Sequence, residues 1–376
     1  MIGALTISRG ALERNAKALR DLVGRGHAAF VVKSNGYGHG LVESARAAEP
    51  FARRICVYAI EEALALREGG IAAPILVLGP VPVDALGDAM AAKLDVALWG
   101  AAEFARRLAQ AARTAQTRAP VHIKVNTGLN RLGFEPHELL DAVEDVLRIS
   151  ELEIAGVFSH FASAEELDSP YTMHQVATFE SAVGAVQPLF ERQGIAPIRH
   201  IAASAAAILW PQTRLDMARF GIALYGLWPS NQTHDAANSN GINLEPALSY
   251  ESKVVAQRFV AAGSAIGYGG TFHAPHDMRV GVVPVGYADG IPRALSNRGA
   301  FLVDGMRCPV VGRIAMNVTQ IDLTPAPNAR IGSTVTLIGS SGTASVTADD
   351  WAIWADTINY EIVTRLPREL PRVYVD

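Results

Sequence analysis

Eight short apolar runs, alternating with helix-like segments, fill the first 230 residues and constrain the fold more than any other feature. The runs begin at residues 28, 55, 73, 95, 121, 154, 198 and 219. Most are separated by Ala/Glu/Arg/Leu stretches with helical periodicity, such as those beginning at 60, 101 and 137. Strands that are apolar on both faces form parallel sheets between helices. Eight such units predict an α/β fold with a (β/α)8 TIM-like barrel. A doubly wound open sheet is the alternative.

After Trp228 the pattern of apolar and polar residues changes. The segment SNQTHDAANSNG, residues 230–241, reads as a polar linker, and β-rich runs punctuated by Gly and Pro follow it. We therefore predict a barrel over residues 9–232 and a mainly β C-terminal domain over 233–376, with one helical patch near 348–361. Residues 1–8 contain a strand that could belong to either part. We assign it to the C-terminal domain, since a barrel that starts at residue 28 has no need of it.

The composition narrows the classes of partner. With 33 Lys+Arg against 37 Asp+Glu the net charge is -4, which argues against nucleic acid or an anionic membrane as the main partner. Cys56 and Cys308 lie far apart in sequence and read as buried thiols in a reducing compartment. The first residues show no signal-peptide pattern, and the longest apolar run, residues 201–210, is too short for a membrane span. We expect a soluble cytoplasmic protein.

Lysine is scarce, which makes its positions informative. Only five occur, at positions 17, 33, 93, 124 and 253. Lys33 ends the first barrel run and precedes a glycine-rich loop, AAFVVKSNGYGHG. Active sites of such barrels lie at the C-terminal ends of the strands. An amine in a partly dry pocket has a lowered pKa and serves as nucleophile or base. The alternative for Lys33 is a side chain that simply reaches solvent from a strand end.

Two further segments carry candidate residues. In HIKVNTGLNRLGF, Lys124 lies within an apolar strand and Arg131 follows seven residues later. A buried lysine needs a compensating partner or a covalent modification, and the plainer alternative is an ion pair with a neighbouring carboxylate. Arg219 and Gly221 lie in the eighth run and Ser204 follows the seventh, where barrels commonly bind phosphate, although Ser and Gly are also ordinary loop residues.

The run VVKSNGYGHG resembles the pyridoxal-phosphate (PLP) lysine signature of the alanine racemase family, the fold-type III racemases. The similarity continues in family order through KVNTGLNRLGF, SHFASA, RFGIALYG, IGYGGTF, PVGYADGIPR, GRIAMNVTQIDL and INYEI, over essentially the whole chain. The resemblance implies a PLP-binding barrel, a C-terminal β domain and an isomerase that interconverts L- and D-alanine. That reaction serves peptidoglycan synthesis or alanine catabolism.

The resemblance also implies a two-base mechanism. Lys33 matches the lysine that carries PLP and then acts as one base, and Tyr268 in GYGG matches the second base. In the family this tyrosine acts at the partner subunit's site, which implies a homodimer with shared active sites. Racemisation needs one group to remove the α-proton and another to return a proton on the opposite face. A lysine and a tyrosine on opposite sides satisfy that requirement.

Other matches supply the cofactor and substrate contacts. Arg219 matches the arginine that faces the pyridine nitrogen and, because it stays protonated, keeps that nitrogen unprotonated. Arg131 matches the residue that contacts the PLP phenolic oxygen and the substrate carboxylate, and Lys124 matches a lysine that is carbamylated in many members. By the same resemblance, the phosphate-binding set is Tyr37, Ser204, Gly221, Ile222 and Tyr360. His160 matches a histidine that packs against the ring, and the alternative for it is an ordinary core histidine. Met316 matches a residue of the partner chain whose backbone N–H binds the substrate carboxylate, and Tyr287 matches a residue that narrows the entrance with Tyr268 and Tyr360.

Departures from the family pattern are few. Asn126 stands where many members have aspartate, and Ala315 and Asn317 stand where Cys-Met-Asp is frequent around Met316. Three alternatives remain. The first is a racemase of broader specificity, and the second is a non-catalytic PLP-homeostasis protein, which lacks the second domain. The third is a metal-dependent barrel hydrolase, which needs clustered His/Asp ligands, and we expect no metal.

Overall fold

The computed structural model describes residues 3–100 and 102–376. They form two compact units, each described here by itself. The barrel unit comprises residues 11–36 and 41–245, and the β-rich unit comprises residues 3–10, Tyr37–Gly40 and Pro246–Asp376. Among the described residues, no helix has both the length and the apolar character needed to cross a bilayer.

All eight predicted strands form in the barrel unit. They are β2 (Ala28–Val31), β3 (Arg54–Val57), β4 (Ile75–Val77), β5 (Leu94–Leu98), β6 (Ala119–Lys124), β7 (Leu152–Phe158), β8 (Ile198–His200) and β9 (Ala218–Phe220). Within the described residues they make one parallel sheet in the order β8-β7-β6-β5-β4-β3-β2-β9. Across the seam between β8 and β9, Asp216 N–H donates to Arg199 O and Arg219 N–H to Ala202 O, each at 3.1 Å. The nearly closed barrel is confirmed, and the open sheet is excluded.

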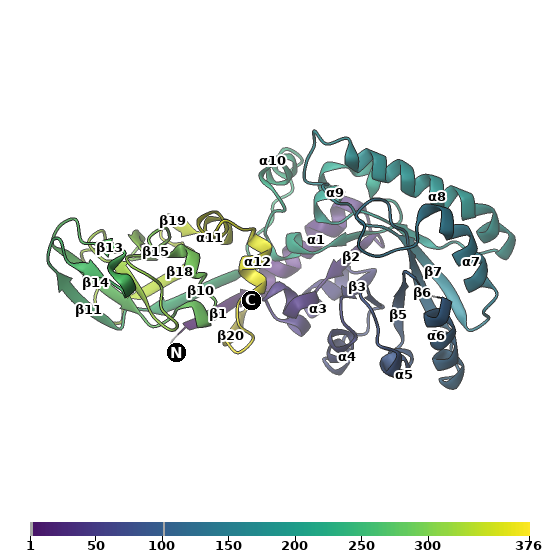
Figure 1. Ribbon diagram of the computed structural model, residues 1–376, viewed down its shortest axis with the longest axis horizontal. Coiled ribbons are helices and arrows are strands. Elements are labelled where there is room, and N and C mark those ends of the chain that lie inside the picture. Colours follow the sequence, from purple (N-terminus) through teal and green to yellow (C-terminus); the bar gives the residue numbers. More distant parts are fainter. Residues whose placement is uncertain (1–2, 101) are drawn as a thin grey trace. The chain divides into compact units, whose positions relative to one another are not determined.

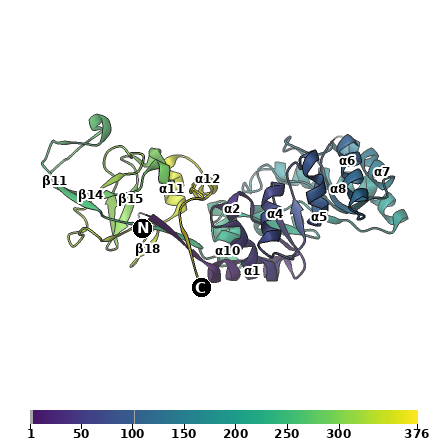
Figure 2. The ribbon, with the colours of Figure 1, turned by 90° about the horizontal axis from the view of Figure 1, so that it is seen from below.

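Helices alternate with these strands, and α4 to α8 follow one another around the outside of the sheet (Figure 1 and Figure 2). They are α1 (Arg9–Val23), α2 (Lys33–Tyr37), α3 (Leu41–Ala48), α4 (Ile60–Glu68), α5 (Leu86–Ala91), α6 (Ala102–Thr114), α7 (Leu139–Leu147), α8 (Tyr171–Gln193), α9 (Ser204–Leu209) and α10 (Asn231–Ser239). In α6, Ala105, Leu108 and Ala112 are buried at helical spacing, which turns one apolar stripe to the sheet.

The segment 230–241, expected to be a polar linker, instead holds helix α10 (Asn231–Ser239), and this expectation was wrong. The Ser230 side chain accepts a hydrogen bond from Thr233 N–H at 3.1 Å, which caps the helix. Thr233 and Ala237 are buried, and α10 contacts α9 of the barrel unit. A polar composition therefore concealed a capped helix with one small buried stripe.

The β-rich unit contains short strands, as predicted. They are β1 (Gly3–Ser8), β10 (Leu248–Lys253), β11 (Ala256–Val260), β12 (Ala265–Ile266), β13 (Phe272–His273), β14 (Met278–Val283), β15 (Ala300–Val303), β16 (Met306–Pro309), β17 (Thr319–Asp322), β18 (Thr334–Ser341), β19 (Ala344–Val346) and β20 (Arg372–Val375), with α11 (Ala348–Ala355) and α12 (Asn359–Thr364). Over the described residues the main sheet runs β16-β15-β18-β10-β1-β20. Strand β1 is antiparallel to β10 and parallel to β20.

Candidate active site

Lys33 directly follows the first barrel strand and opens a turn of unusual hand. Ser34, Asn35 and Gly36 have φ values of 55°, 56° and 60° with ψ near 50°, and Tyr37 has φ 50°, so the short helix α2 is left-handed inside. Each non-glycine residue in this conformation costs about 1–2 kcal/mol. Such strain persists only where the surroundings hold it, and it is concentrated at functional sites.

Glu62, which the sequence analysis did not single out, helps to hold this turn. Its carboxylate accepts a hydrogen bond from Ser34 N–H at 2.6 Å and others from Tyr58 N–H at 3.0 Å and Ala59 N–H at 3.2 Å. The loops after β2 and β3 are thus joined by one side chain. A glutamate in the first turn of a helix reads as a capping residue, and only the fold shows its second partner.

Cationic groups gather at the C-terminal ends of the barrel strands. Burial lowers the pKa of Lys33, as does the nearby positive charge of Arg131, while Glu62 opposes both effects. The Lys33 Nζ lies 5.8 Å from the centre of the Tyr58 ring. Partial burial beside a second cation thus favours the neutral amine of Lys33, the form that acts as nucleophile or base.

Lys124 is more deeply buried, with 6% of its surface exposed. Burial, followed by the charges of Arg131 and Arg219, lowers its pKa to about 8. Its Nζ lies 5.7 Å from the centre of the Phe158 ring, and no carboxylate among the described residues contributes to its pKa. The structural ion pair considered for Lys124 is therefore not formed.

Arg219 and His160 lie beside these lysines. Arg219 Nη2 donates to Ser159 O at 2.8 Å and lies 3.2 Å from His160 Nδ1. Burial lowers the pKa of Arg219 to about 10, so the guanidinium remains charged at neutral pH. The pKa of His160 lies well below its ordinary value because of burial and then of the surrounding cations, Arg219 first. The imidazole is neutral.

Two predicted phosphate-binding residues are in contact. Ser204, at the start of α9, accepts a hydrogen bond from Gly221 N–H at 3.1 Å, and both residues are buried. Ile222 follows at the start of a 3-10 turn that ends at Tyr225. These groups lie after strands β8 and β9, as the sequence predicted for a phosphate site.

The loop that carries Arg131 is organised by Asn126. Its amide nitrogen donates to Glu135 at 2.7 Å and to Asn130 Oδ1 at 2.9 Å, and its oxygen accepts from Gly128 N–H at 3.2 Å and Asn130 N–H at 2.9 Å. An aspartate has no amide donor for Glu135. The asparagine at position 126, which departs from the family pattern, therefore has a hydrogen-bond acceptor in Glu135 of the same loop.

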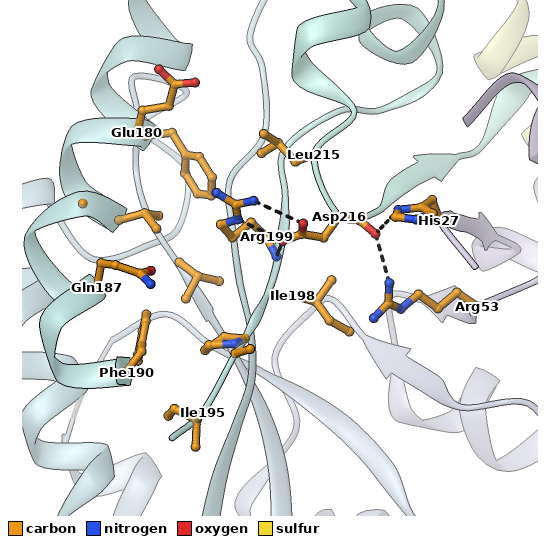
Figure 3. Close-up of a pocket in the computed structure, with 16 residues that line it drawn as sticks. His27, Arg53, Glu180, Gln187, Phe190, Ile195, Ile198, Arg199, Leu215 and Asp216 are labelled. Atoms are coloured by element: carbon orange, nitrogen blue, oxygen red, sulfur yellow. Dashed lines mark hydrogen bonds and ion pairs between the residues drawn. The ribbon is translucent and has the colours of Figure 1, made fainter. Parts of the chain in front are cut away.

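Two cavities occupy opposite ends of the barrel strands. A cavity of about 250 Å³ is lined by Arg131, His160, Phe161 and Ala203, among others, at the C-terminal ends. A larger one of about 720 Å³ lies at the N-terminal ends, between α8 and the Arg199–Asp216 ion pair (Figure 3). The larger cavity contains none of the predicted site residues, whereas Arg131 and His160 line the smaller one, at the end of the barrel where active sites lie.

The remaining predicted residues lie in the β-rich unit. Tyr268 opens a 3-10 turn between β12 and β13 and is 71% exposed. The Met316 carbonyl accepts from Ala288 N–H at 2.9 Å, whereas no group in the described part of the chain engages the Met316 N–H. Tyr287, next to Ala288, is also exposed. The unit thus presents a phenol and a free backbone donor on its surface.

Gly286 makes the Met316 segment possible. A Cβ at this position would lie 2.1 Å from Ala315 O and 2.6 Å from Met316 O. Asn317, a departure from the family pattern, donates to Asp289 Oδ2 at 3.3 Å. The backbone around Met316 is held by carbonyl contacts that do not depend on the side chains at 315 and 317.

Tyr37 and Tyr360 also lie together in the β-rich unit, with ring centres 6.3 Å apart. The segment Tyr37–Gly40 is tied to this unit by Arg372 Nε, which donates to Gly38 O at 2.8 Å. Two tyrosines far apart in sequence are thereby brought side by side, as a shared phosphate-binding role requires.

Comparison with known proteins identifies the family. Residues 7–229 match the model of the alanine racemase N-terminal domain, and residues 247–374 match that of the C-terminal domain. The alanine racemase of Desulforamulus reducens is 37% identical over 373 residues, 98% of each chain, and that of Symbiobacterium thermophilum is 38% identical over 370 residues, 98% of this chain and 96% of the relative.

Solved structures agree over the whole length. The alanine racemase of D-cycloserine-producing Streptomyces lavendulae has a TM-score of 0.92 at 35% identity and covers 100% of this chain and 97% of its own. The Bacillus anthracis alanine racemase with bound L-Ala-P has a TM-score of 0.89 at 32% identity, and the match covers 100% of this chain and 95% of the Bacillus anthracis chain. The chain therefore belongs to the alanine racemase family and is an enzyme of the isomerase class.

Proposed function

We propose that this enzyme is a PLP-dependent alanine racemase that interconverts L- and D-alanine. The observation that carries the proposal is the group of Lys33, Lys124, Arg131 and Arg219 at the C-terminal ends of the strands, whose charges lower one another's pKa values or that of His160. The names of the relatives, and L-Ala-P in the Bacillus anthracis structure, support the same substrate.

The residues fit PLP as a group. A cationic site whose Lys124, Arg219 and His160 lack carboxylate partners in the described residues suits an anionic ligand. Lys33 supplies an amine of lowered pKa for the cofactor's aldehyde, and the Ser204 hydroxyl with the Gly221 and Ile222 backbone suits its phosphate. Tyr37 and Tyr360, whose rings lie together, remain proposed phosphate-binding residues. When bound, PLP would withdraw electrons from the α-carbon and make its proton acidic.

Two bases would then act on opposite faces of the α-carbon. Lys33 Nζ would remove or return the proton on one face, and the lowering of its pKa favours the unprotonated amine that this role requires. Tyr268 of a second subunit would serve the other face. The 71% exposure of Tyr268 supports this role, since a base shared with another copy must project from its own unit. A homodimer with shared active sites follows from the proposal.

The remaining groups would bind and orient. Arg219, charged and buried, would face the pyridine nitrogen as a donor only, which limits competing PLP reactions. Arg131 would hold the substrate carboxylate together with the backbone N–H of Met316 of a second subunit. Carbamylation of Lys124 would turn a buried ammonium into an anion beside Arg131. His160 would pack neutral against the ring, and Tyr287 would narrow the entrance.

A racemisation assay over a panel of L-amino acids, with and without added PLP, tests the proposal. We expect alanine to react much faster than larger amino acids, although discrimination by size alone is modest, about 10- to 200-fold for each methylene. Comparable rates over the panel would instead establish a broad-specificity racemase. Bound PLP without turnover would identify a homeostasis protein.

The free buried thiols Cys56 and Cys308 suit a cytoplasmic enzyme. Its role would be to supply peptidoglycan precursors or to act in alanine catabolism. Deletion of the gene, with growth compared in medium with and without D-alanine, separates these two roles.

A further inference from the structure

Four successive contacts join Arg219 to Arg54 through the barrel interior. Arg219 Nη1 lies 2.7 Å from His200 Nδ1, and His200 Nε2 lies 2.8 Å from His122 Nδ1. His122 Nε2 lies 3.3 Å from Asp95 Oδ2, and the same oxygen accepts from Arg54 Nε at 2.6 Å. We name these five residues the buried relay.

The relay is built into the barrel. Its members come from β3, β5, β6, β8 and β9, and at most 13% of any of these side chains is exposed. His200 stacks on Phe158 with ring centres 4.9 Å apart and planes within 1°. A Cβ at Gly156 would lie 2.3 Å from His122 Nδ1, so only glycine leaves room for this imidazole. The β6–β7 register also shifts between Val121 and His122.

The groups at the two ends of the relay, Arg219 and Asp95, determine which ring nitrogen of each histidine carries the proton. Arginine only donates, so His200 Nδ1 must accept and the proton of the neutral ring lies on Nε2. That N–H donates to His122 Nδ1, which places the His122 proton on Nε2, toward Asp95. Burial raises the pKa of Asp95, but its interaction with His122 and the charge of Arg54 outweigh burial and hold that pKa below the ordinary value, so Asp95 is ionised. All the protons then point in one direction, from His200 through His122 toward Asp95.

The histidines are neutral in this arrangement. Burial is the first cause that lowers the pKa of His122, and burial followed by the charge of Arg219 holds the pKa of His200 well below its ordinary value. The contact between His122 Nε2 and Asp95 is the longest in the relay and lies outside strict hydrogen-bond geometry. It is therefore an electrostatic contact, and the charge on Asp95 matters more than its shape.

We propose that Asp95, anchored by Arg54, is a positioning residue that fixes the tautomers of His122 and His200 and thereby holds the Arg219 guanidinium in place. The proposal rests on the proposed function only in what Arg219 does for the cofactor. His200 holds Arg219 Nη1 through its Nδ1 and its carbonyl oxygen, while Arg219 Nη2 bonds Ser159 O and Ile201 O and lies beside His160. An aspartate that orders a histidine in this way sets its tautomer without being protonated itself.

The first test requires no substitution. Protein labelled with ¹⁵N-histidine gives imidazole nitrogen shifts that distinguish the two tautomers and the charged ring, and His122→Gln and His200→Gln assign the two signals among ten histidines. We expect both rings to be neutral with Nε2 protonated, in the apoprotein and with PLP bound. A charged ring, or a proton on Nδ1 of either, overturns the relay.

The second test removes the charge with Asp95→Asn. We expect Nδ1-protonated His122 or His200 to appear, the pH dependence of the visible spectrum of bound PLP to change, and kcat to fall about 10- to 100-fold with little change in KM, as expected for a lost charged hydrogen bond. Asp216→Asn, which removes an aspartate paired with Arg199 outside the relay, is the matched control for stability.

The outcomes separate the two proposals. If Asp95→Asn keeps the histidine tautomers, spectrum and kcat of the wild type, the relay has no positioning role. If the wild type neither binds PLP nor racemises alanine, the proposed function fails, while the nitrogen shifts still decide whether Asp95 orders the histidines. Equal losses in Asp95→Asn and Asp216→Asn would reduce Asp95 to a stabilising residue and overturn the inference.

Discussion

The side-chain amide of Asn126 donates a hydrogen bond to Glu135 Oε1 at 2.7 Å and so closes the loop that carries Arg131. Asn126→Asp would place a second carboxylate beside the exposed Glu135 and remove the amide donor of a buried side chain. We expect the free energy of unfolding to fall by about 1–3 kcal/mol, the typical cost when a buried hydrogen-bonding group loses its partner. The KM for alanine should rise, because Arg131 is less well held. Urea denaturation and steady-state kinetics measure both. Recovery in the double variant Asn126→Asp, Glu135→Gln assigns the loss to charge repulsion; without recovery, this explanation fails.

Lys33→Ala removes the amine of the strained turn. We expect activity to fall by at least about a thousandfold, since a positioned base and nucleophile is lost. Borohydride should no longer fix PLP to the protein, which peptide mass mapping detects. Lys17→Ala, which removes an exposed lysine of α1, is the control and should bind PLP as the wild type does. PLP still fixed to the Lys33 variant would contradict the assignment.

Tyr268→Phe keeps the aromatic ring and removes the phenol. Removal of deuterium from the α-carbon of L-alanine should slow by about 10²–10⁴-fold, the usual contribution of a positioned base, whereas removal from D-alanine by Lys33 should change much less. Single-turnover measurements with each α-deuterated enantiomer provide the comparison. Equal slowing of both enantiomers would reject the division of labour between the two bases.

Lys124 makes stability depend on pH in a defined direction. Its pKa falls from 10.5 to about 8 on folding, so the unfolded chain binds more protons between these values. The destabilising effect, on the order of 3 kcal/mol, is complete below pH 8 and is relieved as the pH rises toward 10.5. In carbonate-free buffer Lys124→Met should therefore be more stable than the wild type at pH 7, and the difference should shrink above pH 8.

Carbonate should modify the Lys124 amine and so alter its effect on stability. A carbamate forms on a neutral amine, so labelling of Lys124 by ¹³C-bicarbonate should increase as the pH rises through about 8. A carbamate signal in the ¹³C spectrum that is absent from Lys124→Met, and that is lost in acid, checks the modification. A wild-type spectrum without that signal at pH 9 would show that Lys124 stays a plain amine.

Gly286→Ala tests the backbone donor at Met316. The added methyl would collide with Ala315 O and Met316 O, so the segment must move, and we expect a higher KM for alanine with a smaller effect on kcat. Gly87→Ala, where a Cβ meets no atom within 4 Å, should be neutral or slightly stabilising. An unchanged KM in Gly286→Ala would argue against a substrate contact at Met316.

The sequence predicted the barrel well because its signal is local. Most strands are short runs buried on both faces, and the eight runs occur in the order in which the strands pair. Helix α10 was missed because its stability comes from the Ser230 cap and from a stripe of Thr and Ala too weak to register as apolar periodicity.

The site was predicted unevenly for a related reason. Lys33 and Arg219 were found because motifs surround them, whereas Glu62, Asp95, His122 and His200 act through partners up to 78 residues away in the chain. It is the closed sheet that brings these residues, distant in sequence, into contact. A histidine inside an apolar run, as in VHIK or IRHI, is the only local signal, and it is equally typical of an ordinary core residue.

The order of strands in the β-rich unit sets a constraint on biosynthesis. Strand β1 is made before both of its neighbours in the sheet, β10 and β20, which begin at residues 248 and 372. During translation β1 therefore has no sheet partner until β10 has been made, and its second partner comes later still, with β20. A fragment that starts at Pro246 would lack this strand and expose two facing sheet edges, a hazard for aggregation. In a nascent chain β1 is therefore exposed to misassembly for as long as its partners are missing, and the sheet of the second unit is complete only when β20 has been made.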